Sequence, residues 1–133
     1  AGLPEACDQG TSEMVRGSTT IFTVKDVAAS LAYYRDCVGF DVAFEYGAPI
    51  FYVGLCSGKV SLHLVSAAQA PRPPGHAAVS IYVDDVDTVH ADLVQRGAKI
   101  LNAPRDQDYG LRDFAIADVD GNMIFFATEL KQR

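Results

Sequence analysis

The sequence predicts an α+β fold of two βαβββ modules, whose curved mixed sheets surround a cleft and carry their helices on the outer face. Three observations lead to this prediction: a short segment that occurs twice, a helical spacing of apolar residues after each copy, and three β-rich runs after each helix. The repeated segment is Val24-Lys25-Asp26-Val27, which returns about 59 residues later as Val83-Asp84-Asp85-Val86. A repeat of this kind predicts that one supersecondary unit is used twice.

Each copy of the segment opens a predicted helix. A helix favours a capping side chain at its start and a residue that tolerates left-handed backbone at its end, and Asp26 with Gly39 meets both needs in the first half. Asp85 and Gly97 do so in the second half. The apolar side chains that share one helix face are Val27, Leu31, Tyr34 and Val38 in the first half and Val86, Val89 and Leu93 in the second. We therefore expect one face of each helix to pack on a sheet.

Three β-rich runs follow each helix. They cover residues 41–45, 50–55 and 60–66 in the first half, and residues 99–101, 112–117 and 122–128 in the second. Ser57-Gly58 and Asp120-Gly121 supply the turns that introduce the last strand of each half. The two halves are therefore predicted to have the same order of elements.

The domain organisation follows from the breaks between these patterns. Residues 67–75 are rich in Pro and Ala, and we interpret them as the linker between module 19–66 and module 76–130. Together the modules form a single predicted domain over residues 19–130. Residues 1–18 lack such a pattern, and we interpret them as a flexible arm or the remnant of a tag.

Strand alternation divides the side chains of the predicted sheets into two sets, because successive residues point to opposite faces. The set that must pack on the helices is Phe22, Val24, Leu62, Leu64, Ala77, Val79, Ile81, Val83, Ile124 and Phe126. The other set is Thr19, Ile21, Thr23, Ser61, His63, Val65, His76, Ala78, Ser80, Tyr82, Met123, Phe125 and Ala127. This second set mixes hydroxyl, imidazole and aromatic groups, which is typical of a lined cavity.

The overall composition excludes several classes of partner. Seventeen acidic residues against eleven basic ones give a formal net charge of -6, and no two Lys or Arg residues are adjacent. We therefore expect neither nucleic acid nor an anionic membrane surface as a partner. The three cysteines have no metal-type spacing and are odd in number, so we expect neither a disulfide framework nor a zinc site, and a reducing cytoplasm fits best.

Several motifs, in this order and spacing, resemble the glyoxalase/bleomycin resistance protein/dioxygenase superfamily, also called the vicinal oxygen chelate superfamily. The resemblance covers residues 19–130 and is closer to the bleomycin-resistance proteins than to the glyoxalases. The motifs are Val24–Val27, Ser30-Leu31, Tyr33–Asp36, Gly39-Phe40, Val83–Asp87, Tyr109–Ala115 and Asp118–Asn122. The last departs from the family pattern, because Val119 stands where the family usually has Pro.

The resemblance implies four metal-ligand positions, on the first and last strands of each module, and they correspond to Thr19, His63, Ala78 and Phe125. Of these only His63 has a side chain that ordinarily ligates a metal, whereas a catalytic metal needs about three protein ligands. His76 lies on the same predicted face as Ala78, displaced by about 6–7 Å along the strand. We therefore expect no metal cofactor, and His63 with His76 is the alternative metal pair.

The residues predicted to contact a ligand are His63, Phe51, Tyr82, Tyr109, Phe125 and Asp113. Aromatic rings on or beside the cleft strands can stack on planar molecules, and the resemblance places Tyr109 at the mouth of the cleft. Asp106, Asp108 and Asp113 surround Tyr109 in the sequence, so an acidic rim would favour a planar cation. For His63, contact with a ligand and a hydrogen bond within the sheet face remain equally open.

Three functional hypotheses follow. The favoured one is a non-catalytic protein that sequesters a small aromatic or cationic molecule, with antibiotics of the bleomycin type as one candidate. The resemblance implies that a homodimer forms the groove, and residues 1–18 could be an exchanged arm. The second hypothesis is a metal-dependent glyoxalase-like lyase or dioxygenase that uses His63 and His76. The third is a scaffold or regulatory domain with a vestigial cavity. The ligand's identity does not follow from the sequence.

Overall fold

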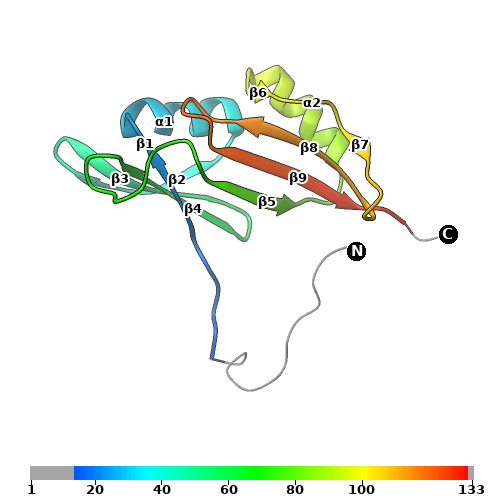
Figure 1. Cartoon of the computed structure of the whole chain (residues 1–133), viewed down its shortest axis with the longest axis horizontal. Helices are drawn as coiled ribbons and strands as arrows, with labels where there is room; N and C mark the ends of the chain where they lie inside the picture. Colours follow the sequence, from blue (N-terminus) through cyan, green and yellow to red (C-terminus); the bar gives the residue numbers. More distant parts are fainter. Residues whose placement is uncertain (1–13, 132–133) are drawn as a thin grey trace.

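The computed structural model describes residues 14–131 and confirms an α+β fold of two modules (Figure 1). The predicted arm lies in part outside the described residues, and the part inside them, residues 14–18, forms neither helix nor strand. Within the described residues, no helix is long and apolar enough to span a membrane.

The first module consists of a strand, a helix and three further strands, as the repeat predicts. Its elements are β1 (Thr20–Val24), α1 (Val27–Tyr33), the π-helical turn η2 (Tyr34–Val38), β2 (Asp41–Gly47), β3 (Ile50–Ser57) and β4 (Val60–Ser66). They form a sheet of strand order β1-β4-β3-β2, in which β1 is parallel to β4 and the other pairs are antiparallel. Asp26 caps α1 by accepting a hydrogen bond from the backbone N–H of Ala29 at 3.1 Å.

The second module repeats this order with one addition. Its elements are β5 (Ala78–Tyr82), α2 (Val86–Arg96), β6 (Lys99–Ile100), β7 (Arg105–Asp106), β8 (Leu111–Ala117) and β9 (Met123–Glu129). The sheet order is β5-β9-β8-β6, and β7 pairs separately with β8. The sequence did not predict β7, because a two-residue strand carries no periodicity to detect. Residues 67–77 connect β4 to β5.

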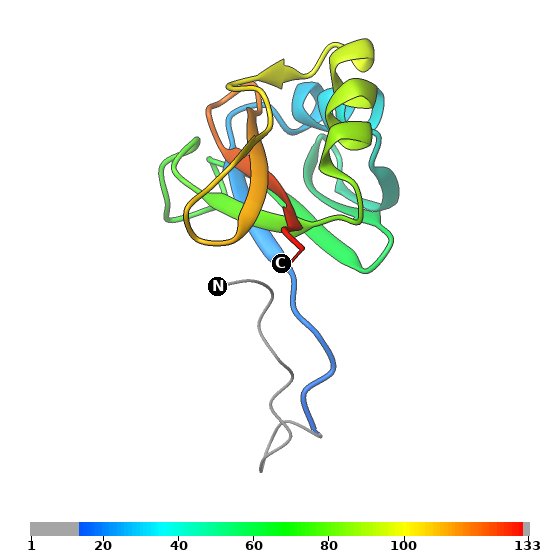
Figure 2. The ribbon, with the colours of Figure 1, turned by 90° about the vertical axis from the view of Figure 1, so that its right-hand side faces the viewer.

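Both helices cover the same side of the two sheets, as Figures 1 and 2 show from perpendicular directions. The core lies between the helices and this side. It contains the predicted helix-facing residues Phe22, Val24, Leu62, Leu64, Ile81, Ile124 and Phe126, all buried, together with the helix residues Val27, Leu31, Tyr34, Val38, Val86 and Leu93. The opposite face of each sheet carries no helix, and we call it the helix-free face. The predicted division of side chains between two faces is therefore confirmed for the core.

The predicted first helix changes its geometry halfway, because it continues as the π-helical turn η2 and ends at Gly39 with φ 84°. The change begins at Tyr34, whose hydroxyl group donates a hydrogen bond of 2.9 Å to the buried carboxylate of Asp118. The hydroxyl group of the preceding Tyr33 also reaches the second module and donates to the carbonyl oxygen of Ala117 at 2.6 Å. Two consecutive helix residues thus bind the second module.

The turn between β8 and β9 completes this contact. Asp118 accepts hydrogen bonds of 2.9 Å from the backbone N–H groups of Asp120, Gly121 and Asn122, which fixes the turn. The side-chain amide of Asn122 donates to the carbonyl oxygen of Thr23 in β1 at 3.0 Å. Buried hydrogen bonds of this kind are expensive to break, because a buried donor or acceptor that loses a partner cannot bind water in its place. They fix how the two modules are oriented.

Candidate functional site

A pocket of about 250 Å³ opens on the helix-free face of the second module. It is lined by Ser80, Tyr82, Tyr109, Leu111, Asp113, Phe125 and Ala127. The strand register brings these residues together. Phe125 of β9 lies between Ser80 of β5 and Ala115 of β8, and Ala127 lies between Tyr82 and Asp113. Because paired residues point to the same face of a sheet, the strands direct these side chains into one concave surface.

Asp113 is the charged group of this pocket, and only 8% of it is exposed. Its carboxylate accepts a hydrogen bond of 2.6 Å from the Tyr109 hydroxyl group and one of 3.0 Å from the side-chain amide of Gln107. Both donors are uncharged. Arg105 lies opposite Asp113 in the β7–β8 register, but none of the ion pairs among the described residues involves Asp113. The pocket therefore contains a buried carboxylate that forms no ion pair with residues 14–131.

Tyr109 and Tyr82 stand at the open side of the pocket, where 50% and 43% of their surfaces are exposed. The hydrogen bond to Asp113 is the main cause that raises the pKa of Tyr109 above 10.0. Tyr109 therefore stays a neutral donor at neutral pH. Phe125 lies half-buried at the floor. Two exposed rings and one inner ring give the pocket aromatic walls beside a carboxylate.

The helix-free face of the first module is built differently. The Tyr52 hydroxyl group and His63 Nδ1 lie 2.8 Å apart, in hydrogen-bond contact. The ring of Phe44 is parallel to that of Tyr52 at 6.1 Å and meets His63 edge-on at 5.2 Å. Gly54 makes room for this arrangement, because a Cβ atom there would overlap the Phe44 ring. We call Phe44, Tyr52 and His63 the aromatic cluster.

Burial in this cluster lowers the pKa of His63 below 6.5. The imidazole is therefore neutral at neutral pH. Of the two interpretations of His63 that the sequence left open, the structure shows the hydrogen bond within the sheet face. A smaller hollow of about 210 Å³ lies beside the cluster and is lined by Ile21, Thr23, Tyr52, Val65, Gln69, Ala70, Pro71 and Arg72.

Four of the six predicted ligand contacts line one pocket: Tyr82, Tyr109, Asp113 and Phe125. His63 lies in the other module. Phe51 does not line this pocket, because it alternates with Tyr52 along β3 and so shares its side of the strand with the buried Val53 and Leu55. Its ring meets Tyr46 edge-on at 5.2 Å. The strand pattern that placed Phe51 beside the cleft did not settle which side of β3 its ring occupies.

The predicted acidic rim also needs correction. Only Asp113 lines the pocket, whereas Asp106 forms an ion pair of 3.0 Å with Arg112. Gln107 is a donor to Asp113 that the sequence analysis missed. It belongs to the hairpin after the unpredicted strand β7, and no periodic signal pointed to it. Ser80 and Ala127, by contrast, follow from the predicted alternation.

The four positions that the resemblance assigns to metal ligands do not fit a divalent metal. Thr19 is within 2.8 Å of the hydroxyl group of Ser61, and Ala78 and Phe125 offer no donor atom. His76 was predicted to share a strand face with Ala78. It is instead exposed and lies before the first residue of β5. Among residues 14–131, no three His, Cys, Asp or Glu side chains are grouped so that they could hold a metal ion. The alternative pair His63 and His76 thus has no third ligand among these residues.

A larger hollow of about 880 Å³ lies between the modules, on the side of the helices. Its lining includes apolar residues of α2 and β5 and the turn between β3 and β4, and the pair Arg96–Asp92 stands at its side with an N–O distance of 2.9 Å. It contains one predicted contact, Tyr82, and lacks a buried charge. Size alone does not make a binding site, and the smaller pocket has the convergent polar groups that recognition requires.

Comparison with known proteins agrees with this fold. A family model described as the Glyoxalase/Bleomycin resistance protein/Dioxygenase superfamily matches residues 17–126. A protein of Mycolicibacterium smegmatis, described as an uncharacterized protein, is 29% identical over 112 residues, which covers 84% of this chain and 92% of that protein.

Two solved structures show how far the likeness extends. TnmS3, an antibiotic binding protein from Streptomyces sp. CB03234, is 27% identical and superposes with a TM-score of 0.73, over 86% of this chain and 96% of TnmS3. A superfamily member from Sphaerobacter thermophilus is 22% identical with a TM-score of 0.74, over 86% of this chain and 98% of that protein. At that identity the second likeness shows the fold alone.

Proposed function

Because the chain belongs to the glyoxalase/bleomycin resistance protein/dioxygenase superfamily, we propose that it binds and sequesters a small planar aromatic cation without transforming it. Antibiotics of the bleomycin type are one candidate class of ligand. The superfamily name covers both enzymes and resistance proteins, so the choice rests on the site. The observation that supports the proposal is the buried carboxylate of Asp113, which forms no ion pair within the described part of the chain and lies in an aromatic pocket.

The ligand's chemistry follows from the two kinds of pocket wall. A positive group close to Asp113 would form the ion pair that this carboxylate lacks among the described residues, and it would use lone pairs that the two neutral donors leave free. A planar ring would stack on Tyr109, Tyr82 or Phe125, and a cation near the rings would gain a cation–π contact as well. Anionic and strongly polar molecules have neither a positive charge to pair with Asp113 nor a planar ring to stack on the aromatic side chains.

Two further observations support binding without catalysis. Three of the four positions that would hold a metal in the enzymes carry Thr, Ala and Phe, so we propose that the protein works without a metal cofactor. TnmS3 is described as an antibiotic binding protein and shares 27% of its residues with this chain. The metal-dependent lyase or dioxygenase would need a group of metal-binding side chains, and residues 14–131 contain no such group of three.

We also propose that a second copy of the chain covers the helix-free faces. Ile21, Phe44, Tyr82 and Tyr109 expose between 42% and 50% of their surfaces there, and exposed apolar groups that gather on one face are typical of an interaction surface. In a single chain the pocket stays open on this side. A homodimer would enclose the ligand, and the oligomeric state in solution, measured by light scattering, tests this part separately.

The binding proposal is tested by calorimetric titration with two probes of the same shape. 9-Aminoacridine is a cation at neutral pH and acridine is not, so we expect the first to bind more tightly by a factor of roughly 10 or more. Bleomycin is titrated in parallel, and the ligand is recovered afterwards to show that it is unchanged. Equal affinity for the two acridines would contradict the role of Asp113, and binding of none of the three would overturn the proposal.

Tyr109→Ala is the first variant to examine. Loss of the ring and of its hydrogen bond to Asp113 should weaken the binding free energy of 9-aminoacridine by roughly 1–3 kcal/mol. Tyr46→Ala is the control, because Tyr46 is also an exposed tyrosine but does not line the pocket. An unchanged affinity in Tyr109→Ala would remove Tyr109 from the site.

A further inference from the structure

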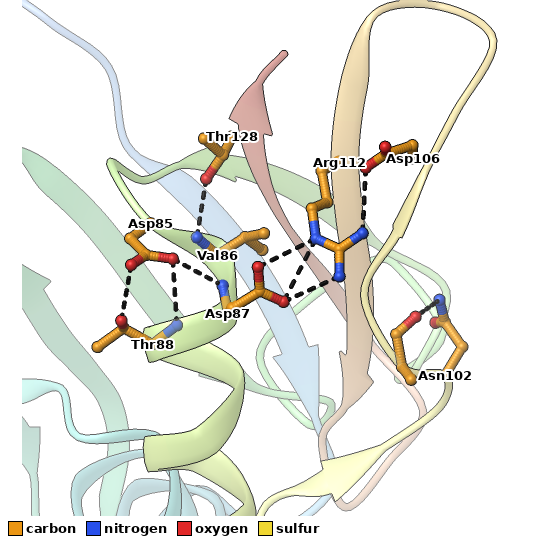
Figure 3. Close-up of polar contacts among 9 residues, drawn as sticks. Asp85, Val86, Asp87, Thr88, Asn102, Asp106, Arg112 and Thr128 are labelled. Carbon is orange, nitrogen blue, oxygen red and sulfur yellow. Dashed lines mark hydrogen bonds and ion pairs between the residues drawn. The ribbon is translucent and has the colours of Figure 1, made fainter. Parts of the chain in front are cut away.

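Arg112 connects two segments that are otherwise separate, the first turn of α2 and the strand β7 (Figure 3). Its guanidinium group donates to both carboxylate oxygens of Asp87, from Nη2 at 3.0 Å and from Nε at 3.1 and 3.3 Å. Its Nη1 atom donates to Asp106 Oδ1 at 3.0 Å. The guanidinium group therefore binds two carboxylates. Two of its nitrogens bind the carboxylate of Asp87, and this two-point contact fixes the orientation of the Arg112 side chain.

The first turn of α2, which carries Asp87, is held by hydrogen bonds at the start of the helix. Asp85 caps α2 and accepts hydrogen bonds from the backbone N–H groups of Asp87 and Thr88 at 3.1 and 3.3 Å. The backbone N–H of Val86 donates to the hydroxyl oxygen of Thr128 in β9 at 2.8 Å, as Figure 3 also shows. Asp87 is thus held in place relative to the sheet that carries the pocket. Arg112 therefore binds a helix turn that is itself attached to this sheet.

The other end of the connection carries the groups that hold Asp113. Asp106 is the last residue of β7 and lies opposite Arg112 in the strand register. The next residues form a turn, in which the backbone N–H of Gln107 donates to the carbonyl oxygen of Leu111 at 2.8 Å. We call residues 107–110 the donor turn, because Gln107 and Tyr109 supply both hydrogen bonds to Asp113.

Arg112 and Asp113 are neighbours in β8, so their side chains point to opposite faces of the sheet. The hairpin is consequently tied from both sides, by Asp113 on the face of the pocket and by Arg112 on the face of the helix. A strand of two residues offers few backbone hydrogen bonds of its own. The ion pair with Arg112 is therefore the main additional restraint on β7.

We propose that Arg112 is the positioning residue of the binding site, which holds the donor turn in place through Asp106. This inference rests on the proposed function, and it assigns to the site a residue that does not touch the pocket. A cationic ligand would share the carboxylate of Asp113 with Tyr109 and Gln107, so the attachment on the pocket side would change when the ligand binds. The attachment on the helix side keeps the turn, and hence the stacking ring of Tyr109, over the ligand.

The first experiment needs no ligand. Hydrogen exchange of the backbone amides of residues 107–111 is measured in the intact protein for the wild type and for R112Q, D106N and D87N. We expect exchange of the Gln107 amide to become several-fold faster in R112Q and in D106N. R96Q is the matched control, because Arg96 forms an ion pair with Asp92 on α2 and does not contact the hairpin. Unchanged exchange in R112Q, or faster exchange in D87N than in D106N, would overturn the proposal.

The second experiment separates positioning from general stability. R112Q should lower the affinity for 9-aminoacridine about 3–10-fold, whereas R96Q should leave this affinity unchanged. In a double-mutant cycle with Y109A, the effect of R112Q should disappear, because Arg112 acts through the turn that carries Tyr109. Full additivity of R112Q and Y109A, or an affinity unchanged in R112Q, would contradict the proposal. If the wild type binds no acridine, the proposed function fails, and the exchange experiment still decides whether Arg112 holds the turn.

Discussion

Gly54 and Ala115 occupy corresponding places in the two modules, since each pairs directly with a residue of the module's last strand, Gly54 with His63 and Ala115 with Phe125. Two residues earlier stand Tyr52 and Asp113. On the first helix-free face the Tyr52 hydroxyl group lies 2.8 Å from His63 Nδ1. On the second, Asp113 receives its hydrogen bonds from the donor turn, outside the strands that wall the pocket.

This difference shows how one scaffold, used twice, gives two faces of different chemistry: a hollow of about 210 Å³ beside the aromatic cluster and a pocket of about 250 Å³ around a buried carboxylate. In the first module the side chains of the aromatic cluster pack against one another, and Gly54 makes room for Phe44. In the second module the small side chains of Ser80 and Ala127 leave space between the rings. On the first face the polar groups of Tyr52 and His63 bind each other, whereas the second face carries a buried carboxylate that forms no ion pair with the described residues.

The largest effect that the comparison predicts is on ligand binding by Asp113→Asn. The substitution keeps the shape of the side chain and removes its charge, so 9-aminoacridine should lose about 1.5–3 kcal/mol of binding free energy, while acridine should change little. Calorimetric titration measures both. Tyr52→Phe is the matched control at the corresponding position and should leave both affinities unchanged. If Tyr52→Phe lowered the affinity for 9-aminoacridine as strongly as Asp113→Asn does, the two faces would not differ in function.

The fold could be predicted from the sequence because its signals are local. The caps Asp26 and Asp85 and the alternation of Phe22 with Thr23 or of Ile124 with Phe125 involve residues that are close along the chain. The hydrogen bond from Tyr34 to Asp118 joins residues 84 positions apart, so the sequence identified Asp118 only as a turn residue. The π-helical turn that begins at Tyr34 was missed together with it.

The site was predicted in part for a similar reason. Alternation placed Tyr82 and Phe125 on one face, and the resemblance added Tyr109. The donor Gln107 and the ion pair from Arg112 to Asp87 depend on how a loop folds back on a strand, which has no period. The side of β3 that Phe51 occupies did not follow from the sequence, because its neighbour Tyr52 is aromatic too and either ring could face the cleft.

A second prediction concerns the packing of the first face. Gly54→Ala would place a methyl group where the Phe44 ring lies, so the ring must leave its position beside Tyr52. Loss of this aromatic contact should lower the free energy of unfolding by about 1 kcal/mol, measured by urea denaturation. The substitution should cost much less in a Phe44→Ala background, because no ring then occupies the space. An equal loss in both backgrounds would show that Gly54 acts through its backbone instead.

A third and smaller effect is expected for Tyr109→Phe on the second face. The ring remains for stacking, but Asp113 loses its shorter hydrogen bond. Because half of Tyr109 is exposed, water can replace the hydroxyl group in part, and the urea midpoint of unfolding should fall only slightly. Affinity for 9-aminoacridine should lie between those of the wild type and Tyr109→Ala. A loss as large as that of Tyr109→Ala would mean that the hydroxyl group, and not the ring, carries the contact.

The smallest effect is the pH dependence that His63 gives to stability. Its pKa is lowered below 6.5 by burial in the folded protein, whereas the unfolded chain takes up the proton as the pH falls through 6.5. The unfolded state then binds more protons, so stability decreases as the pH falls below about 6.5 and levels off below the pKa of the folded state. Because the ring is only half-buried, this loss is a fraction of a kcal/mol. His63→Gln should flatten the decline in urea midpoint between about pH 7.5 and about pH 5, and His76→Gln, at an exposed site outside the cluster, should not. An undiminished slope in His63→Gln would show that the aromatic cluster accommodates the charged imidazole, and the first face would then resemble the second in tolerating a charge.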